Sequence, residues 1–441
     1  MVFKKFNRLT LSSREKKTFR LHLTYSIIEG FIAGILVLNE FVFLKSLQGS
    51  DYQIGFLFQF SVIAMALLLL FNEFIRRVGN KRKLLRITGI VTRIPLISML
   101  FFPSGVAGIT GNDWYHTLFL AVFLIYFLAN LVIYPTINLL LKTNYDHPNF
   151  GELYGYATSA NKVLMLVSTL LFGILLDFNN FAFVYVYPGL AMLSITSLFL
   201  LSNIDYEEPD NSEKKESFLK AVRHSSVRMV HILRFNKPYL HFEIGFMLYG
   251  FAFMSTVAVI TIFFERALHL NYSSVGFYKN IYNIIAILLL PLLGRIIGKT
   301  DPRRFAIYTF TAFLLYFFFM GLTEYLPFNI TWIGIKIYPV LLVAIFCNGI
   351  FAATMALLWY IGSAYFCRKE EAADYQSVHL SLTGIRAIFA PILGVFFYEM
   401  IDFSGTFLIA IFFLLSAIVL MVWSLRKYPV RKENTGNNRT T

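Results

Sequence analysis

The chain has 441 residues, of which 57% are hydrophobic in type and only 15% are charged, whereas about 25% of the residues of an average soluble domain are charged. This charge content, together with a mean hydropathy of +0.64, indicates an integral membrane protein and excludes a disordered chain, a fibre and an ordinary cytosolic enzyme. The net charge of +14 does not point to nucleic acid, because the basic residues gather between apolar runs rather than on one patch. The lipid bilayer is the expected partner.

Twelve apolar stretches follow one another along the chain, each long enough for the roughly 20 residues that a helix needs to cross a hydrocarbon core. In lipid, backbone polar groups must bond within their own segment, so these stretches are predicted to be helical despite their many Val, Ile and Phe residues. The predicted spans are 21–44, 52–75, 84–104, 115–141, 152–176, 181–202, 239–264, 274–294, 305–323, 335–362, 373–398 and 405–425.

The distribution of the basic residues predicts the orientation. Of the 39 Lys and Arg residues, 32 lie in the N-terminal segment, in the alternate loops that follow the even-numbered spans, and in the tail. Only Lys45, Arg266 and Lys336 lie on the opposite side. The positive-inside rule therefore predicts that both termini are cytoplasmic and that the number of spans is even. The compact loops and the short tail favour a bacterial inner (plasma) membrane.

An internal repeat links the two halves of the sequence. At a constant offset of 221 residues, glycines, a tyrosine and the basic loops align without gaps: Gly55 with Gly276, Gly173 with Gly394, Tyr154 with Tyr375, and Arg82 with Arg303. This pattern predicts two parallel copies of a six-helix unit. The predicted domains are a basic N-terminal segment (1–20), an N-terminal six-helix bundle (21–202), a cytoplasmic linker (203–238), a C-terminal six-helix bundle (239–425) and a tail (426–441).

With six plus six spans, a long middle loop and parallel halves, the chain resembles the major facilitator superfamily of secondary transporters. The loop between spans 2 and 3 of that family carries a Gly, an Asp and a basic cluster. Here residues 76–82 keep Gly79 and Arg82 but lack the Asp, and Asp301 and Arg303 belong to a degenerate second copy. The resemblance implies that these loops form a cytoplasmic gate, and that two bundles alternate around a midplane site lined mainly by spans 1, 4, 7 and 10. It does not resolve the subfamily.

Two basic residues inside spans are candidates for substrate binding. Arg386 lies near the middle of span 11, on one helical face with His379 and Thr383, and a guanidinium can bind a carboxylate or phosphate with two hydrogen bonds. Lys162 lies at intermediate depth in span 5. The alternatives are a structural arginine that binds a neighbouring helix, and a lysine whose stem reaches towards the membrane surface.

Glu29, in span 1, is the deepest acidic residue. A carboxylate that pairs with Lys162 or Arg386 in only one conformation would bind and release a proton, so Glu29 is the candidate for proton coupling. The equally weighted alternative is a permanent ion pair within the N-terminal bundle. Glu243 and Lys279 lie closer to the ends of their spans and are expected to reach the membrane surface.

His379, on the same helical face as Arg386, is also a candidate for substrate binding, and uncharged polar residues on other spans complete the candidate site. Asn130 and Tyr134 lie on span 4 and Asn348 lies on span 10, both of which the resemblance assigns to the cavity. Such residues also join helices through hydrogen bonds in many membrane proteins, which is the alternative interpretation.

The predicted function is secondary active transport of a small organic solute, anionic or zwitterionic, by alternating access, with the proton as a candidate coupling ion. The alternatives are an exporter of lipophilic or aromatic compounds, and a transporter-like sensor that moves nothing. An enzyme is not expected, because the sequence contains no nucleophile with a base, no metal-ligand cluster and no phosphate-binding loop. No cofactor or metal is predicted, and a monomer is expected.

Overall fold

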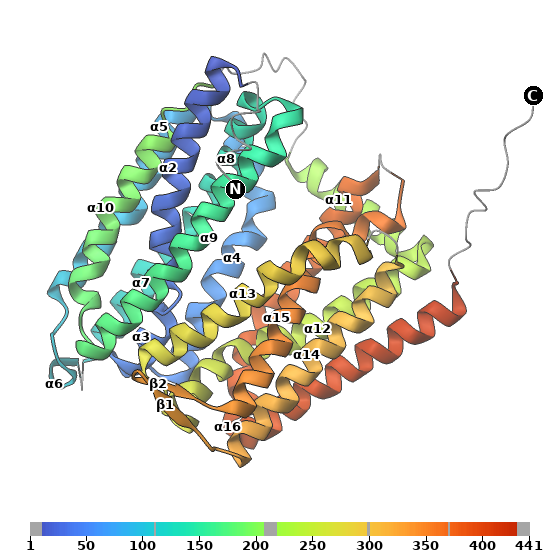
Figure 1. The fold of residues 1–441 in the computed structure, drawn as a ribbon. Coiled ribbons are helices and arrows are strands. Elements are labelled where there is room, and N and C mark those ends of the chain that lie inside the picture. The colour runs from blue at the N-terminus through green and yellow to red at the C-terminus, as the bar shows by residue number, and fades with distance from the viewer. Residues whose placement is uncertain (1–10, 110–111, 207–217, 298–299, 369–370, 430–441) are drawn as a thin grey trace, which may run out of the picture.

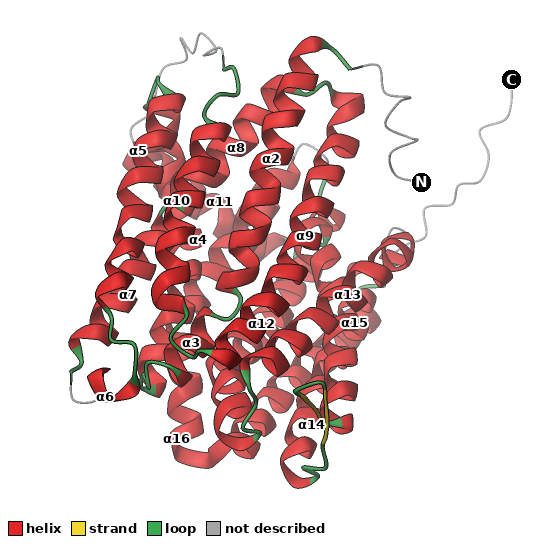
Figure 2. Ribbon diagram, turned by 60° about the vertical axis from the view of Figure 1, so that its left-hand side comes forward, coloured by secondary structure: helices red, strands yellow, loops and turns green. Residues whose placement is uncertain are grey.

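The computed structural model describes residues 11–109, 112–206, 218–297, 300–368 and 371–429. The predicted N-terminal segment up to residue 10, the acidic part of the linker at 207–217 and the tail from residue 430 lie outside these ranges. Figure 2 shows that the described chain is almost entirely helical, with loops at the two ends of long helices.

The first half of the chain forms one helical bundle, on the left in Figure 1. Its helices are α2 (Ser13–Leu36), α3 (Asn39–Lys45), α4 (Asp51–Arg77), α5 (Lys81–Arg93), the 3₁₀ helix η1 (Ile94–Phe101), α6 (Val106–Ile109), α7 (Trp114–Leu128), α8 (Asn130–Asn144), α9 (His147–Phe178) and α10 (Phe183–Leu201). Helix α2 begins eight residues before the predicted span because Ser12 and Glu15 form a capping box that satisfies the first backbone N–H groups.

The second half forms the other bundle, on the right in Figure 1. It contains α12 (Lys237–Ile262), the π-helix η2 (Phe263–Ala267), α13 (Tyr272–Ile297), α14 (Pro302–Tyr325), strands β1 (Ile330–Trp332) and β2 (Ile335–Ile337), α15 (Pro339–Ile361), the 3₁₀ helix η3 (Ser363–Phe366) and α16 (Ala372–Lys427). The linker contains α11 (Phe218–Phe235).

One predicted boundary is wrong at span 10. Residues 335–337 form β2, an antiparallel partner of β1 with Ile330 opposite Ile337. The hairpin turns at Ile333 and Gly334, which both have positive φ, as the tightest hairpin loops require. The helix begins only at Pro339, a residue suited to a first helical turn because its missing N–H needs no partner there.

Helix α16 contains two predicted spans. The backbone leaves helical geometry at Ile401 and Asp402, and the chain folds back at this point, because His379 and Ser424 both contact the first two turns of α12. Ten continuous stretches of the described chain are long and apolar enough to cross a membrane, and 374–427 contains two of the predicted spans. Helix α4, which covers the predicted span 52–75, is not among these ten.

The 221-residue repeat is visible in the backbone. Gln48 and His269, which are repeat partners, both adopt positive φ, at 56° and 46°. Each is flanked by the same unusual hydrogen bonds, from Leu47 N to Val42 O and Gly49 N to Phe43 O in the first half, and from Leu268 N to Phe263 O and Leu270 N to Phe264 O in the second. The prediction of an internal repeat is confirmed.

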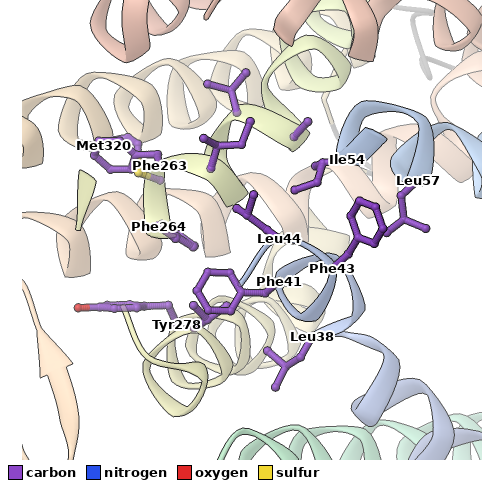
Figure 3. Close-up of a cluster of buried hydrophobic side chains, with 14 of the residues drawn as sticks. Leu38, Phe41, Phe43, Leu44, Ile54, Leu57, Phe263, Phe264, Tyr278 and Met320 are labelled. Carbon is purple, nitrogen blue, oxygen red and sulfur yellow. The ribbon is translucent and has the colours of Figure 1, made fainter. Parts of the chain in front are cut away.

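The two bundles touch at one end and diverge towards the other (Figure 1). We call the touching end, where β1 and β2 lie, the hairpin end, and the opposite end, where α11 lies, the linker end. Buried apolar side chains from both bundles fill the contact. Figure 3 shows part of this cluster, with Leu38, Phe41, Phe43, Leu44, Ile54 and Leu57 from the first bundle and Phe263, Phe264, Tyr278 and Met320 from the second.

Candidate functional site

An ion pair joins the bundles at the hairpin end. The two terminal guanidinium nitrogens of Arg266, Nη1 and Nη2, donate to the carboxylate of Asp51 at 2.8 and 2.6 Å. The Asp51 side chain is 10% exposed and the Arg266 side chain 43%. Two parallel hydrogen bonds give this pair a defined geometry as well as charge attraction. The pair connects the start of α4 to the π-helix η2.

A second polar contact joins α9 to the start of α13. The carboxylate of Asp177 accepts hydrogen bonds from the backbone N–H groups of Tyr272, at 2.7 Å, and Ser273, at 3.0 Å. It therefore satisfies two of the donors that a helix start leaves unpaired and places negative charge at the positive end of the helix dipole. Gly173, one turn earlier on α9, lies against the backbone of Ser273.

Lys279 crosses between the bundles deeper in the contact. Its ammonium group donates to the carbonyl oxygen of Val37 at 2.6 Å and lies 3.9 Å from Glu40. The interruption between α2 and α3 makes this carbonyl available. The expectation that Lys279 reaches out to the membrane surface is wrong, because the contacts that it makes are with the first bundle.

Two further contacts between the bundles lie towards the linker end from those described above. Asn280 donates to the carbonyl oxygen of Leu166 at 2.8 Å, and Gln59 donates to that of Ile388 at 2.6 Å.

Lys162 lies one helical turn beyond the contact of Leu166, on the side of the linker end. Its side chain is partly buried, and its ammonium nitrogen lies 3.9 Å from the sulfur of Met165. Within the described residues, no acidic side chain pairs with it. The neighbouring Asn161 donates to Ser26 O and packs against Gly30, which holds this turn of α9 against α2.

Arg386 is enclosed within the second bundle. Its side chain lies against Gly250 on α12, donates to the carbonyl oxygen of Phe246 and lies 5.6 Å from the ring centre of Tyr249. The residue is 2% exposed, and its Nε has no hydrogen-bond partner within the described chain. In this conformation Arg386 connects α16 to α12, which is the structural alternative considered from the sequence.

His379 and Glu243 form a buried pair one to two turns from Arg386. The imidazole Nδ1 lies 3.1 Å from each oxygen of Glu243, and the two side chains are 1% and 2% exposed. The expectation that Glu243 reaches the membrane surface is wrong. A carboxylate here is retained because the imidazole and Arg386 offset the cost of burying its charge.

Glu29 lies away from the second bundle. Ser197 on α10 donates to its carboxylate at 2.5 Å, and the basic residue with which it interacts electrostatically is Arg93. Arg93 in turn donates to Ser194 Oγ at 2.9 Å and Tyr126 O at 2.8 Å. The carboxylate thus belongs to a polar network inside the first bundle, which corresponds to the alternative of a fixed ion pair.

The uncharged candidates lie on helices of both bundles. Asn130 begins α8 directly after the helix is interrupted at Ala129, Tyr134 is 45% exposed, and Asn348 is partly buried on α15. Within the described residues, neither amide side chain forms a hydrogen bond.

The residues of the predicted cytoplasmic gate are engaged within their own bundles. Arg82 donates to Ser202 O at 3.0 Å and, with Gly79, lines a pocket of about 730 Å³ at the linker end. Arg303 donates to Asp301 at 2.8 Å and to Ser424 O at 3.0 Å. Arg82 and Arg303 are repeat partners. Each lies at the start of the third predicted span of its bundle and donates to a backbone carbonyl near the end of the sixth.

Sequence reasoning missed the ion pair at the hairpin end and the partner of His379. A signal for the first was present, because Arg266 is one of only three basic residues predicted on its side of the membrane. No periodic pattern predicted that Glu243 pairs with His379, because the two residues are 136 positions apart in the sequence.

Comparison with known proteins identifies the family. A sequence model described as Major Facilitator Superfamily matches residues 21–337, so the chain belongs to this superfamily of membrane transporters. No curated protein matches the sequence. The predicted fold class, an all-helical membrane protein with two bundles of this type, is confirmed.

Solved structures share the fold at low sequence identity. A mutant of the nucleoside transporter NupG superposes with a TM-score of 0.68 at 13% identity, covering 93% of this chain and 100% of that one. A bacterial homologue of the human lysosomal transporter Spinster, inward-facing and unoccupied, gives 0.64 at 12% identity, with 95% and 98% coverage. The xylose transporter XylE from E. coli, partially occluded and inward open, gives 0.61 at 14% identity, with 97% and 100% coverage.

Proposed function

We propose that this protein transports a small organic anion or zwitterion across the bacterial inner membrane by alternating access, as a monomer, with a proton as the coupling ion. The observation that supports an anionic substrate is Lys162, a cation without an acidic partner in the described chain, which lies on α9 one helical turn from Leu166, the contact of Asn280 from the other bundle. An unpaired charge at the centre of a membrane helix costs roughly 2.5–3.5 kcal/mol on insertion scales, so such residues are retained mainly for function.

The arrangement of the bundles supports an inward-facing state. The positive-inside rule predicts that the linker end is cytoplasmic, and the described contacts between the bundles gather at the hairpin end. A solute would therefore reach Lys162 from the cytoplasm. Asn130 and Tyr134 on α8 and Asn348 on α15 would supply hydrogen bonds, and the gate residues Gly79, Arg82, Asp301 and Arg303 would come together only when the linker end closes.

A thermal-stability screen of the purified protein tests the substrate class. Ligands that bind only the folded protein raise its melting temperature by mass action. We expect anionic or zwitterionic metabolites to stabilise the parent protein, and Lys162→Gln to lose at least about tenfold in apparent affinity, since one charge-assisted contact contributes about 1.5–3 kcal/mol. Lys142→Gln, which removes an exposed cation at the end of α8, is the matched control.

Other outcomes select the alternatives. Stabilisation by lipophilic cations or neutral aromatic compounds, equal in parent and Lys162→Gln, would favour the exporter. Binding without flux in proteoliposomes would favour the sensor.

Glu29 remains the proposed carrier of the coupling proton. We expect Glu29→Gln to lose solute accumulation driven by a pH gradient and to retain counterflow, because solute exchange requires no net proton movement. Accumulation that persists in the variant would assign Glu29 to the fixed network with Arg93 and Ser197.

A further inference from the structure

The segment that leads from the end of α14 to the turn of the hairpin is exposed and apolar. Every residue from 325 to 334 is exposed, and none of them is charged. Its large apolar side chains are Tyr325, Leu326, Phe328, Ile330, Trp332 and Ile333. Surfaces in contact with water rarely present a contiguous apolar patch of this kind, and such patches mark contacts with proteins or membranes. The composition of this segment is therefore that of a contact surface.

The hairpin is fixed to the protein through its second strand. The backbone N–H of Lys336 on β2 donates to Ser274 Oγ at 2.8 Å, and the hydroxyl of Tyr278 donates to Lys336 O at 3.0 Å. The ammonium group of Lys336 donates to His269 O at 2.8 Å. Within the described residues the sheet contains only these two strands. Since a two-stranded hairpin is marginally stable in water by itself, these bonds hold the exposed strand β1 in one place.

The turn of the hairpin meets the end of α9 at the contact between the bundles. The side-chain amide of Asn271 donates to Gly334 O and to the carboxylate of Asp177, each at 2.8 Å. Phe178, the last residue of α9, is 92% exposed, and Ile333 at the turn is 81% exposed. The residues next to the two acceptors therefore present apolar side chains outward, one from each bundle.

This turn lies at the level of the membrane edge. Asp177 directly follows the predicted span 152–176, so Asn271 binds α9 where that helix leaves the hydrocarbon. Helix α14, which is long and apolar enough to cross a membrane, leads into the segment with one exposed face. That face carries Leu315, Phe318 and Tyr325. Lipid is therefore the partner continuous with the segment, and Trp residues such as Trp332 are enriched at the headgroup level.

Ile333 occupies a backbone conformation that a β-branched residue rarely adopts. Its φ is 47°, where Gly, Asn and Asp are usual. An exposed isoleucine gains nothing from water in return for this strain, whereas removing its apolar surface from water is favourable. The residue type at the turn thus also favours an apolar environment outside the protein.

We propose that Phe178, Trp332 and Ile333 insert into the lipid interface at the hairpin end, as one apolar patch that crosses the contact between the two bundles. Apolar groups bound at an interface lie about 5–10 Å into the boundary between headgroups and acyl chains. The free edge of β1 stays at the headgroup level, because its backbone groups can bond to water there and not in hydrocarbon. This contact with lipid is independent of the transported solute.

Quenching by brominated lipids tests the insertion. Trp332 becomes the single tryptophan in a Trp114→Phe, Trp359→Phe, Trp423→Phe chain, which is reconstituted in liposomes. We expect lipids brominated near the headgroup to quench its emission more than lipids brominated near the chain end, and iodide on both sides of the membrane to quench it weakly. Lys142→Trp in a tryptophan-free chain, at an exposed position of the linker end, is the matched control and should show strong iodide quenching and little quenching by lipid.

Two variants test the other members of the patch. Phe178→Trp, in a chain with no other tryptophan, should show the same preference for bromine near the headgroup. Ile333→Asn keeps a residue suited to positive φ and removes the apolar side chain, so the quenching of Trp332 by lipid should weaken. Thr331→Asn exchanges one exposed polar residue for another in the same hairpin and should leave this quenching unchanged.

The remaining outcomes are equally decisive. Strong iodide quenching of Trp332 without any effect of brominated lipid would overturn the insertion, and protection from both quenchers would overturn it in favour of a second copy paired along β1. If lipid quenches Trp332 but not Phe178→Trp, the patch does not cross the two bundles. Should the single-tryptophan chain not fold, the parent protein is compared with Trp332→Phe, in which a loss of quenching by lipid is expected.

Discussion

Breaking the ion pair between Asp51 and Arg266 is expected to move the protein towards the state that is closed at the linker end. In the proposed alternating-access cycle, the two hydrogen bonds of this pair would break when the hairpin end opens, so Asp51→Asn should lower the stability of the present state relative to its alternative. A contact of this type contributes about 1–3 kcal/mol, which corresponds to a change of roughly 5- to 150-fold in the ratio of the two populations.

Spin labels measure this shift. Lys142 and Arg368 lie near the linker end, one in each bundle, and both are exposed. Cysteines at these positions, in a chain whose Cys347 and Cys367 are replaced by serine, report the distance between the bundles. We expect a longer distance to dominate in the parent and a shorter one to gain population in Asp51→Asn.

Two further variants separate the ion pair from a general effect of charge. Asp113→Asn removes a carboxylate that is 96% exposed and should leave the distances unchanged. The exchanged pair Asp51→Arg with Arg266→Asp should restore the parent distribution. Identical distributions in the parent and in Asp51→Asn would show that the pair does not hold the hairpin end closed.

Gly394→Ala is expected to be among the most damaging small substitutions in the chain. A Cβ atom at Gly394 would overlap the carbonyl oxygen of Ser255 on α12, and neither backbone can move without separating two packed helices. Overpacking of this kind costs about 1–3 kcal/mol, and more where only backbone atoms are in contact. The melting temperature of the purified protein should fall clearly.

Gly155→Ala is the matched control, because a Cβ atom there would have no atom within 4 Å. Alanine in an exposed helical position is favoured over glycine by roughly 0.5–1 kcal/mol, so this variant should melt at the same or a higher temperature. Equal melting temperatures for Gly394→Ala and Gly155→Ala would contradict the close contact between α12 and α16.

The repeat partner of Gly394 should respond differently. Gly173 lies against Ser273 of the other bundle, so Gly173→Ala should favour opening of the hairpin end, measured with the same spin labels, more than unfolding. The two glycines occupy equivalent positions in the sequence repeat, yet one contact lies within a bundle and the other lies between the bundles.

Most of the fold was predictable from the sequence. The helical spans, the repeat and the pattern of basic loops depend on the composition of long segments, which a bilayer constrains strongly. The predicted site was less predictable. Depth and helical face identified Lys162 and Arg386, but these criteria do not say which neighbour a side chain meets, and Arg386 packs against Gly250 inside its own bundle.

What the sequence by itself determined is the membrane class, the repeated six-helix unit and the buried charge of Arg386, whereas it placed Glu243 and Lys279 at the membrane surface. Each follows from periodicity or from the cost of placing a polar group in lipid, which are properties of single segments. Only the tertiary structure decided the partners: Asp51 with Arg266, Lys279 with Val37 and Glu40, and Glu243 with His379. These pairings join residues on helices far apart in the sequence, and they depend on helix rotation and crossing, which no local pattern encodes.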